Sequence, residues 1–217
     1  PFKRLVLAFF VSQFGSAVST VLFVFFIRGV VQDQENFLLF LFVFYGAQLV
    51  GIPFWVRIAR TVDKHRAWCV ALFLFSALQC SYLLLGPGDF YWMLPVAVCT
   101  GFCGATFRVL PESMKADVID IDALDSGEDR AAWFFAVWSF AIKVAASVAP
   151  AFALWALALT NFDPQPNVVN APEDLLGLRL LFCLGPATGF TLCALIAWRY
   201  PLTRTAHEAL RRRLAQP

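Results

Sequence analysis

Charged residues are scarce in this sequence: they make up 15% of its 217 residues, whereas hydrophobic residues make up 60%. A soluble globular domain has roughly a quarter of its residues charged. The mean hydropathy is +0.70, and the apolar residues form separate runs. Each run is close to the ~20 residues that a helix needs to cross a bilayer. The low charge therefore argues against a soluble domain and predicts a polytopic α-helical membrane protein.

Motifs for catalysis and for metal or phosphate binding are also missing. The sequence holds only two histidines, and it has neither a nucleophile elbow nor a glycine-rich phosphate loop. The cysteines lack both the paired loop spacing of disulfides and the companion ligands of a metal site, so we interpret them as small core residues. We therefore expect no enzyme, no metal site, no cofactor and no nucleic-acid partner. The cysteines are Cys69, Cys80, Cys99, Cys103, Cys183 and Cys193.

Six apolar runs are long enough to span a membrane. We place them at residues 5–31, 37–58, 67–85, 91–110, 131–160 and 175–200, so that residues 1–200 form a six-helix transmembrane bundle and residues 201–217 a basic tail. In the first run, Ser12, Ser16 and Ser19 follow an i, i+4, i+7 spacing and form one polar stripe. The stripe is either a surface for close helix packing or the lining of an aqueous cavity, and the sequence leaves both open.

The lysines and arginines predict the orientation of the bundle. With six spans, both termini and the joints after the second and fourth spans share one side of the membrane. Cytoplasmic segments are enriched in lysine and arginine, so both termini and the tail are expected in the cytoplasm, at the plasma (bacterial inner) membrane. The opposite side carries only Arg28 and Arg179. The cytoplasmic set is Lys3, Arg4, Arg57, Arg60, Lys64, Arg66, Lys115, Arg130, Arg199, Arg204, Arg211, Arg212 and Arg213.

Two further cations, Arg108 and Lys143, fall inside apolar spans, where a charge is costly and usually functional. On a helix, Trp138, Ser139 and Lys143 lie on one face. An aromatic ring beside a hydroxyl and a cation suits a sugar-like ligand, and a structural ion pair is the alternative for Lys143. Arg108 either reaches into a central cavity or extends to the inner headgroups.

The charged joints allow two interpretations. The acidic stretch after residue 120 is expected to be a solvated loop for Asp122, Asp125 and Asp129. Two carboxylates nearer the helix end, Asp117 and Asp120, are placed to pair with cations of the other cytoplasmic joint and to form a gate there. Those cations are Arg57, Arg60 and Lys64. In the same joint, His65 is expected to be a solvated loop residue.

Several of these segments resemble the glycoside–pentoside–hexuronide:cation symporters, the melibiose-carrier-like branch of the major facilitator superfamily. The similarity lies in Ala-Asp-Val-Ile-Asp (116–120), the charged gap after it, and Phe-Phe-Ala-Val-Trp-Ser-Phe (134–140) followed by Lys143. Residues 1–5, 51–56, 64–68 and 161–164 also resemble the second half of that family. The resemblance covers essentially the whole chain but only spans seven to twelve of a twelve-span transporter.

This resemblance implies a secondary transporter that works by alternating access and couples Na⁺ or H⁺ to sugar movement. It places Lys143 near the sugar and cation sites, and Trp138 and Ser139 near the sugar. The coupling ion would be bound mainly by carboxylates of an N-terminal six-helix half, which is then the main partner, together with membrane lipid. Where family members often carry an aromatic or acidic residue, this chain has Arg108, which favours an acidic sugar.

Three functions are therefore considered. The first is the C-terminal half of a sugar:cation symporter, for a sugar or a sugar acid. The second is a related carrier of another solute, such as a lipid or an organic anion. The third is a non-transporting membrane module that packs on a partner. An upstream six-span half would favour the first two.

Overall fold

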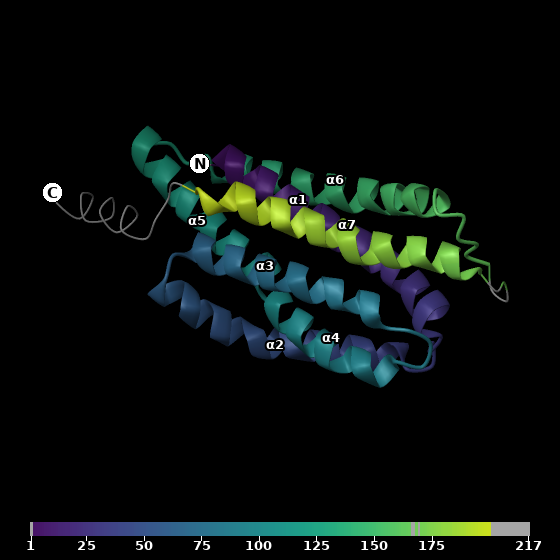
Figure 1. Ribbon diagram of the computed structural model, residues 1–217. Helices are drawn as coiled ribbons and strands as arrows, with labels where there is room; N and C mark the ends of the chain where they lie inside the picture. Colours follow the sequence, from purple (N-terminus) through teal and green to yellow (C-terminus); the bar gives the residue numbers. More distant parts are fainter. Residues whose placement is uncertain (1, 166–167, 169, 201–217) are drawn as a thin grey trace.

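The computed structural model describes residues 2–165, 168 and 170–200, and this part of the chain is helical without strands. It holds six helical segments that are long and apolar enough to cross a membrane, which confirms the predicted all-α membrane class. The predicted tail at 201–217 lies outside the described residues. The helices, shown in Figure 1, are α1 (Phe2–Phe26) with the π-helical turn η1 (Ile27–Val31), α2 (Phe37–Thr61), α3 (Lys64–Ser81) with the 3₁₀ turn η2 (Tyr82–Leu84), α4 (Phe90–Gly104), α5 (Thr106–Ser126), α6 (Ala131–Ala158) and α7 (Pro172–Trp198).

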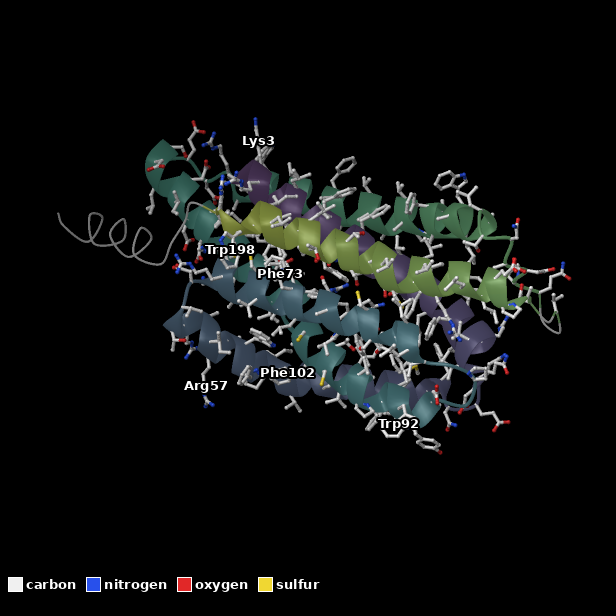
Figure 2. All side chains as sticks on the ribbon, viewed as in Figure 1. Lys3, Arg57, Phe73, Trp92, Phe102 and Trp198 are labelled. Carbon is white, nitrogen blue, oxygen red and sulfur yellow. The ribbon has the colours of Figure 1, made fainter. Side chains whose placement is uncertain are left out.

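The helices run back and forth, so that the joints alternate between two ends of the bundle. One end holds the start of α1, the α2–α3 and α5–α6 joints and the end of α7 (Figure 1). We call it the basic end, because Lys3, Arg57 and Lys64 lie there. Figure 2 shows Lys3 and Arg57 pointing away from the bundle. This is the end that the lysine and arginine distribution predicts to be cytoplasmic.

The fourth span is longer than expected. Instead of ending near residue 110, the chain breaks at Ala105 and continues as α5 to Ser126. There Gly127 ends the helix with a φ of 68°, and its N–H donates to the Ala123 carbonyl at 3.0 Å. A glycine adopts this left-handed conformation without steric cost. As a result, Asp122 and Asp125 are helical, and the expectation that they form a loop was wrong.

The third span starts earlier than expected, at Lys64, and this changes the setting of His65. The side chain of His65 is only 4% exposed, so its assignment as a solvated loop residue was wrong. With the helix beginning at Lys64, the 3.6-residue period places His65 and Cys69 on the face that packs against α7. His65 lies against Tyr200, and the Cys69 thiol donates to the Ala194 carbonyl at 3.3 Å.

Glycines allow α2 and α4 to approach closely. A Cβ atom added to Gly101 would lie 2.3 Å from the Phe44 carbonyl oxygen, and one added to Gly51 would lie 2.6 Å from that of Phe102. The indole N–H of Trp55 donates to the same Phe102 oxygen at 2.9 Å. Lipid tails are as apolar as the side chains, so contact of this kind, rather than water exclusion, holds such helices together.

The helices α2 and α6 bury the smallest share of their residues inside the bundle. Large apolar side chains such as Phe42 and Leu49 on α2, and Phe140 and Trp155 on α6, are exposed. The buried core forms two clusters. One contains Leu5, Trp68, Met114 and Trp138, and the other contains Leu22, Phe26, Phe90 and Phe182.

We expect Gly101→Ala to lower the stability of the full-length protein by about 1–3 kcal/mol, because the new methyl group must displace the α2 backbone. Thermal unfolding in detergent measures this as a fall in Tm. Gly46→Ala on α2 is the matched control, since nothing lies within 4 Å of its added Cβ. Equal Tm values for the two variants would contradict the close contact between α2 and α4.

Candidate functional site

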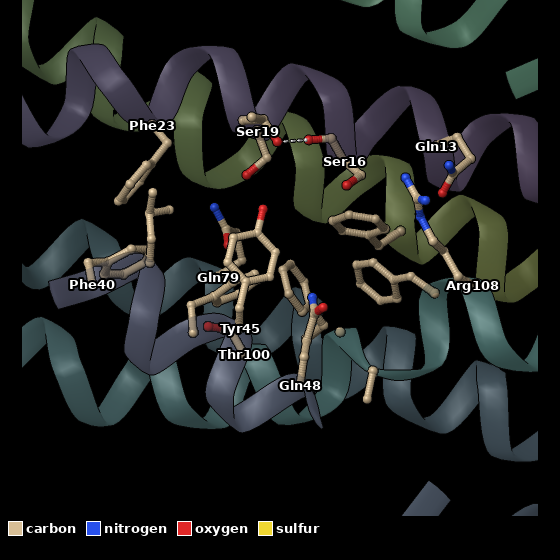
Figure 3. A pocket seen from close by; sticks show the side chains of 18 of the residues that line it. Gln13, Ser16, Ser19, Phe23, Phe40, Tyr45, Gln48, Gln79, Thr100 and Arg108 are labelled. Atoms are coloured by element: carbon tan, nitrogen blue, oxygen red, sulfur yellow. Dashed lines mark hydrogen bonds between the residues drawn. The ribbon is translucent and has the colours of Figure 1, made fainter. Parts of the chain in front are cut away.

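A cavity of about 660 Å³ lies in the bundle, lined by α1, α2, α3, η2, α4, α5 and α7. Figure 3 shows polar side chains entering it from several helices between aromatic rings. The aromatic walls come from both core clusters, for example Phe75 and Phe107 from one and Phe23 and Phe182 from the other. The polar lining residues are Gln13, Ser16, Ser19, Thr20, Tyr45, Gln48, Gln79, Tyr82, Thr100 and Arg108.

The polar stripe on α1 serves both of the purposes that the sequence allowed. Gln13, Ser16 and Ser19 line the cavity. Ser12 instead is fully buried in the helix packing. The stripe therefore changes its role along α1: Ser12 packs inside the bundle, and Ser16 and Ser19, further along the same face, line the cavity.

Some polar side chains of the cavity are hydrogen-bonded within the described part of the chain and others are not. Gln79 donates to the Phe182 carbonyl at 3.1 Å, and the Tyr82 hydroxyl lies 3.3 Å from that of Thr100. By contrast, the Gln13, Tyr45 and Gln48 side chains make no hydrogen bond within the described residues. These three side chains remain available to hydrogen-bond a polar solute.

Arg108 is the one charged side chain among the described residues that line the cavity. Figure 3 shows it extending from α5 toward α1, close to Gln13. Within the described part of the chain, no carboxylate lies within 4.0 Å of its guanidinium. Of the two positions considered for Arg108, the cavity is the one observed. An arginine in this setting can bind an anion through two parallel hydrogen bonds.

The predicted α6 residues do not line this cavity. Trp138 is 1% exposed, and its ring stacks on Phe9 with centroids 4.1 Å apart and an interplanar angle of 11°. Ser139 and Lys143 are exposed on α6 instead. Among the described residues no carboxylate lies within 4.0 Å of the Lys143 ammonium. The binding roles of these three residues therefore remain predictions.

One of the ion pairs predicted between the two joints forms at the basic end. The Lys64 Nζ lies 2.6 Å from Asp117 Oδ2 and ties α3 to α5. Both side chains are partly exposed, so the pair adds at most about 1 kcal/mol of stability. Arg57 and Asp120 are exposed, and Arg60 lies in the last turn of α2. Beyond the end of α7, burial and the nearby Asp117 carboxylate raise the pKa of Tyr200.

The sequence analysis missed a cluster that joins α5 to α6. Glu112 accepts a hydrogen bond from the Trp138 indole N–H at 2.7 Å and forms an ion pair with Lys115. The Lys115 ammonium lies 4.3 Å from the centroid of Phe135 and 5.1 Å from that of Trp138. Lys115 is only 5% exposed.

A signal for this cluster was present in the sequence. Lys115 follows Leu110, Pro111 and Met114 and precedes Val118, which are the residues that define the buried face of α5. A lysine on the apolar face of a helix needs a counter-charge, and Glu112 stands one turn before it. We had counted Lys115 only as a cation of the cytoplasmic joint, since the helix was expected to end before it.

The known proteins that this chain is similar to are named as transport proteins, symporters or carriers. The sequence profile of a family described as MFS/sugar transport protein matches residues 1–204. The chain is 25% identical over 175 residues to an uncharacterized symporter of Synechocystis sp., covering 78% of this chain and 32% of that protein. It is 25% identical over 206 residues to the glucuronide carrier protein homolog of Escherichia coli (89% and 41%). It is 26% identical over 221 residues to the sodium-dependent lysophosphatidylcholine symporter 1-A of Danio rerio (96% and 39%). The chain thus spans less than half the length of these relatives.

The cluster around Lys115 yields a stability prediction. Glu112→Ala should destabilise the full-length protein by about 1–3 kcal/mol, because it leaves a buried ammonium and an indole N–H without their acceptor. Lys115→Met should stay within about 1 kcal/mol of the wild type, since an apolar side chain of similar length fits the same space. Thermal unfolding in detergent compares the two. Equal losses of stability in both variants would show that the Glu112 carboxylate does not neutralise the Lys115 ammonium.

Proposed function

Because the chain belongs to the MFS/sugar transport protein family, we propose that it is the C-terminal half of a secondary transporter that moves a sugar acid together with a cation. The observation that carries this proposal is the cavity with a single arginine among uncharged polar and aromatic side chains. Six of its helical segments are long and apolar enough to cross a membrane, and the chain is an integral membrane protein.

The lining of the cavity suits a sugar that bears a carboxylate. Its volume of about 660 Å³ lies within the range of small-molecule sites, roughly 300–1,000 Å³. Gln13, Tyr45 and Gln48 offer unused hydrogen-bonding groups for hydroxyls, and the phenylalanine rings offer flat apolar surfaces for the sugar ring. Arg108 then binds the carboxylate. A neutral sugar would leave the guanidinium without a counter-charge in an apolar bundle.

The names of two relatives fit this chemistry. A glucuronide carries a carboxylate, and lysophosphatidylcholine carries a phosphate. Arg108 can bind either anion. We favour the sugar acid because most of the polar lining is neutral hydrogen-bonding side chains spread along the cavity, which match several hydroxyls. A lipid-like or other organic anion is the second candidate, and the uptake experiment separates the two.

Coupling to Na⁺ or H⁺ is assigned mainly to the N-terminal half. Within the described residues, no group of three or more His, Cys, Asp or Glu side chains could hold a metal ion. Lys143 is exposed in the middle of an apolar span, where a cation requires an anionic partner. We propose that carboxylates of the N-terminal half supply that partner and bind the coupling ion, with Ser139 and Lys143 facing them.

Alternating access then opens the cavity to each side of the membrane in turn. We propose that both termini lie in the cytoplasm, at the bacterial inner membrane, and that the basic end is the cytoplasmic end. The ion pair of Lys64 and Asp117, with Arg57, Arg60 and Asp120 nearby, is proposed to act in the gate at that end.

Uptake by the full-length protein in proteoliposomes tests the proposed substrate. We expect uptake of glucuronate, and we expect Arg108→Ala to raise its half-saturating concentration by roughly 10- to 100-fold, since hydrogen bonds to a charged group contribute about 1.5–3 kcal/mol. If neutral methyl glucoside is also taken up, its half-saturating concentration should change little in Arg108→Ala, because it has no carboxylate for the guanidinium to bind. Arg57→Ala is the control, because Arg57 is an exposed arginine away from the cavity.

Imposed gradients in the same vesicles test the coupling. A Na⁺ or H⁺ gradient should drive accumulation in the wild type, and Lys143→Ala should abolish it when equal amounts of protein are reconstituted. Unchanged glucuronate uptake in Arg108→Ala would contradict the assigned site. Uptake of lysophosphatidylcholine with no uptake of any glycoside or uronate would replace the sugar acid by the lipid.

A further inference from the structure

Glu112 follows Arg108 by four residues on α5, so the two side chains project from one helix face one turn apart. Arg108 is exposed and lines the cavity, while the Glu112 side chain is 45% exposed. Because residues four apart on a helix are neighbours, a change of the Glu112 rotamer can bring its carboxylate to the Arg108 guanidinium without moving the backbone.

In this structure Glu112 is bound elsewhere. One carboxylate oxygen accepts the Trp138 N–H at 2.7 Å, and the other pairs with the buried Lys115. These bonds connect α5 to α6 and leave Arg108 without a carboxylate among the described residues. The carboxylate therefore has two alternative sets of partners. One set is Trp138 and Lys115, and the other is Arg108.

We propose that Glu112 competes with the anionic group of the solute for Arg108 and thereby links solute binding to the attachment of α5 to α6. This inference rests on the proposed function of the cavity. With the solute anion on Arg108, Glu112 stays on Trp138 and Lys115, and α5 is held against α6. Without it, Glu112 turns to Arg108 part of the time and the bond to Trp138 breaks. Glu112 is thus a positioning residue that sets solute affinity through Arg108.

The order of the two residues keeps this exchange reversible. In a helix, a cation that precedes an anion by four residues forms a weaker pair than the reverse order, because the reverse order also suits the helix dipole. A solute anion held by two parallel hydrogen bonds can therefore displace Glu112. Lys115 is buried beside two aromatic rings and has Glu112 as its counter-charge there. This favours the return of Glu112 from Arg108 to Lys115 and Trp138.

Two substitutions shift the competition in opposite directions. Trp138→Phe keeps the aromatic stack on Phe9 but removes the N–H donor, so Glu112 spends more time on Arg108. Glu112→Gln keeps the size of the side chain but cannot form a charged pair, so Arg108 is left free. We expect the affinity for glucuronate to fall roughly threefold or more in Trp138→Phe and to rise by a smaller factor in Glu112→Gln, because in the wild type Glu112 is mostly bound to Trp138 and Lys115. Both effects should vanish in an Arg108→Ala background.

A measurement without solute tests the exchange independently of the proposed function. Phenylglyoxal modifies arginine side chains, and a carboxylate bound to the guanidinium slows the reaction. In the full-length protein, site-resolved mass spectrometry should show slower modification of Arg108 in Trp138→Phe and faster modification in Glu112→Gln than in the wild type. Arg57 in the same samples is the internal control and should react equally in all three.

Equal rates at Arg108 in the three proteins, or a change in the same direction in both variants, would overturn the proposal. If Glu112→Gln does not fold because Lys115 loses its counter-charge, the double variant Lys115→Met/Glu112→Gln removes that charge and serves in its place. Protection of Arg108 by glucuronate in the wild type tests the substrate instead. Its absence, with the rate differences intact, would reject the substrate and retain the exchange.

Discussion

A guanidinium inside an apolar helix bundle is costly unless something binds it, and this constraint connects most of what the structure shows. Arg108 is exposed and lines the cavity, and no carboxylate within the described part of the chain neutralises it. The bundle therefore holds a strong anion-binding group, with no counter-charge from the described residues, among neutral hydrogen-bonding side chains. Lys143 presents the same problem on α6, where it is exposed and does not line this cavity. We propose a different partner for each cation: a solute for Arg108 and the N-terminal half for Lys143.

The helix α5 carries the groups that connect the cavity with the basic end. Along about two and a half turns it places Arg108 in the cavity, Glu112 and Lys115 against α6, and Asp117 against α3. It is joined to α4 only through the break at Ala105. Movement of α5 at this break would thus affect the solute site and both inter-helix contacts together. A helix that contacts several others in this way is well suited to transmit occupancy of the cavity to the proposed gate.

The sequence predicted the class of fold and the six membrane-spanning segments, and it marked Arg108 and Lys143 as unusual charges, because the length of an apolar run and a charge within it can be read locally. Trp138 and Lys143, which were expected on one face, are five residues apart and thus about 140° apart around α6, so one is buried while the other is exposed. The sequence analysis missed Lys115 because charge near a predicted helix end was taken for a loop, whereas α5 continues for four turns beyond residue 110. His65 was misjudged for the same reason, since the start of α3 lay earlier than expected. The stripe on α1 was recognised, but its division between packing and cavity required the neighbouring helices.

The location of the solute is tested most directly by substituted-cysteine labelling in the full-length protein, in a background without native cysteines. Ser16→Cys places a thiol in the cavity, whereas Ser139→Cys places one on the exposed face of α6. We expect glucuronate to slow the reaction of a water-soluble thiol reagent at position 16, and to leave position 139 unprotected or less protected. Protection at position 139 with none at position 16 would contradict this site and move the solute to the α6 face that carries Lys143.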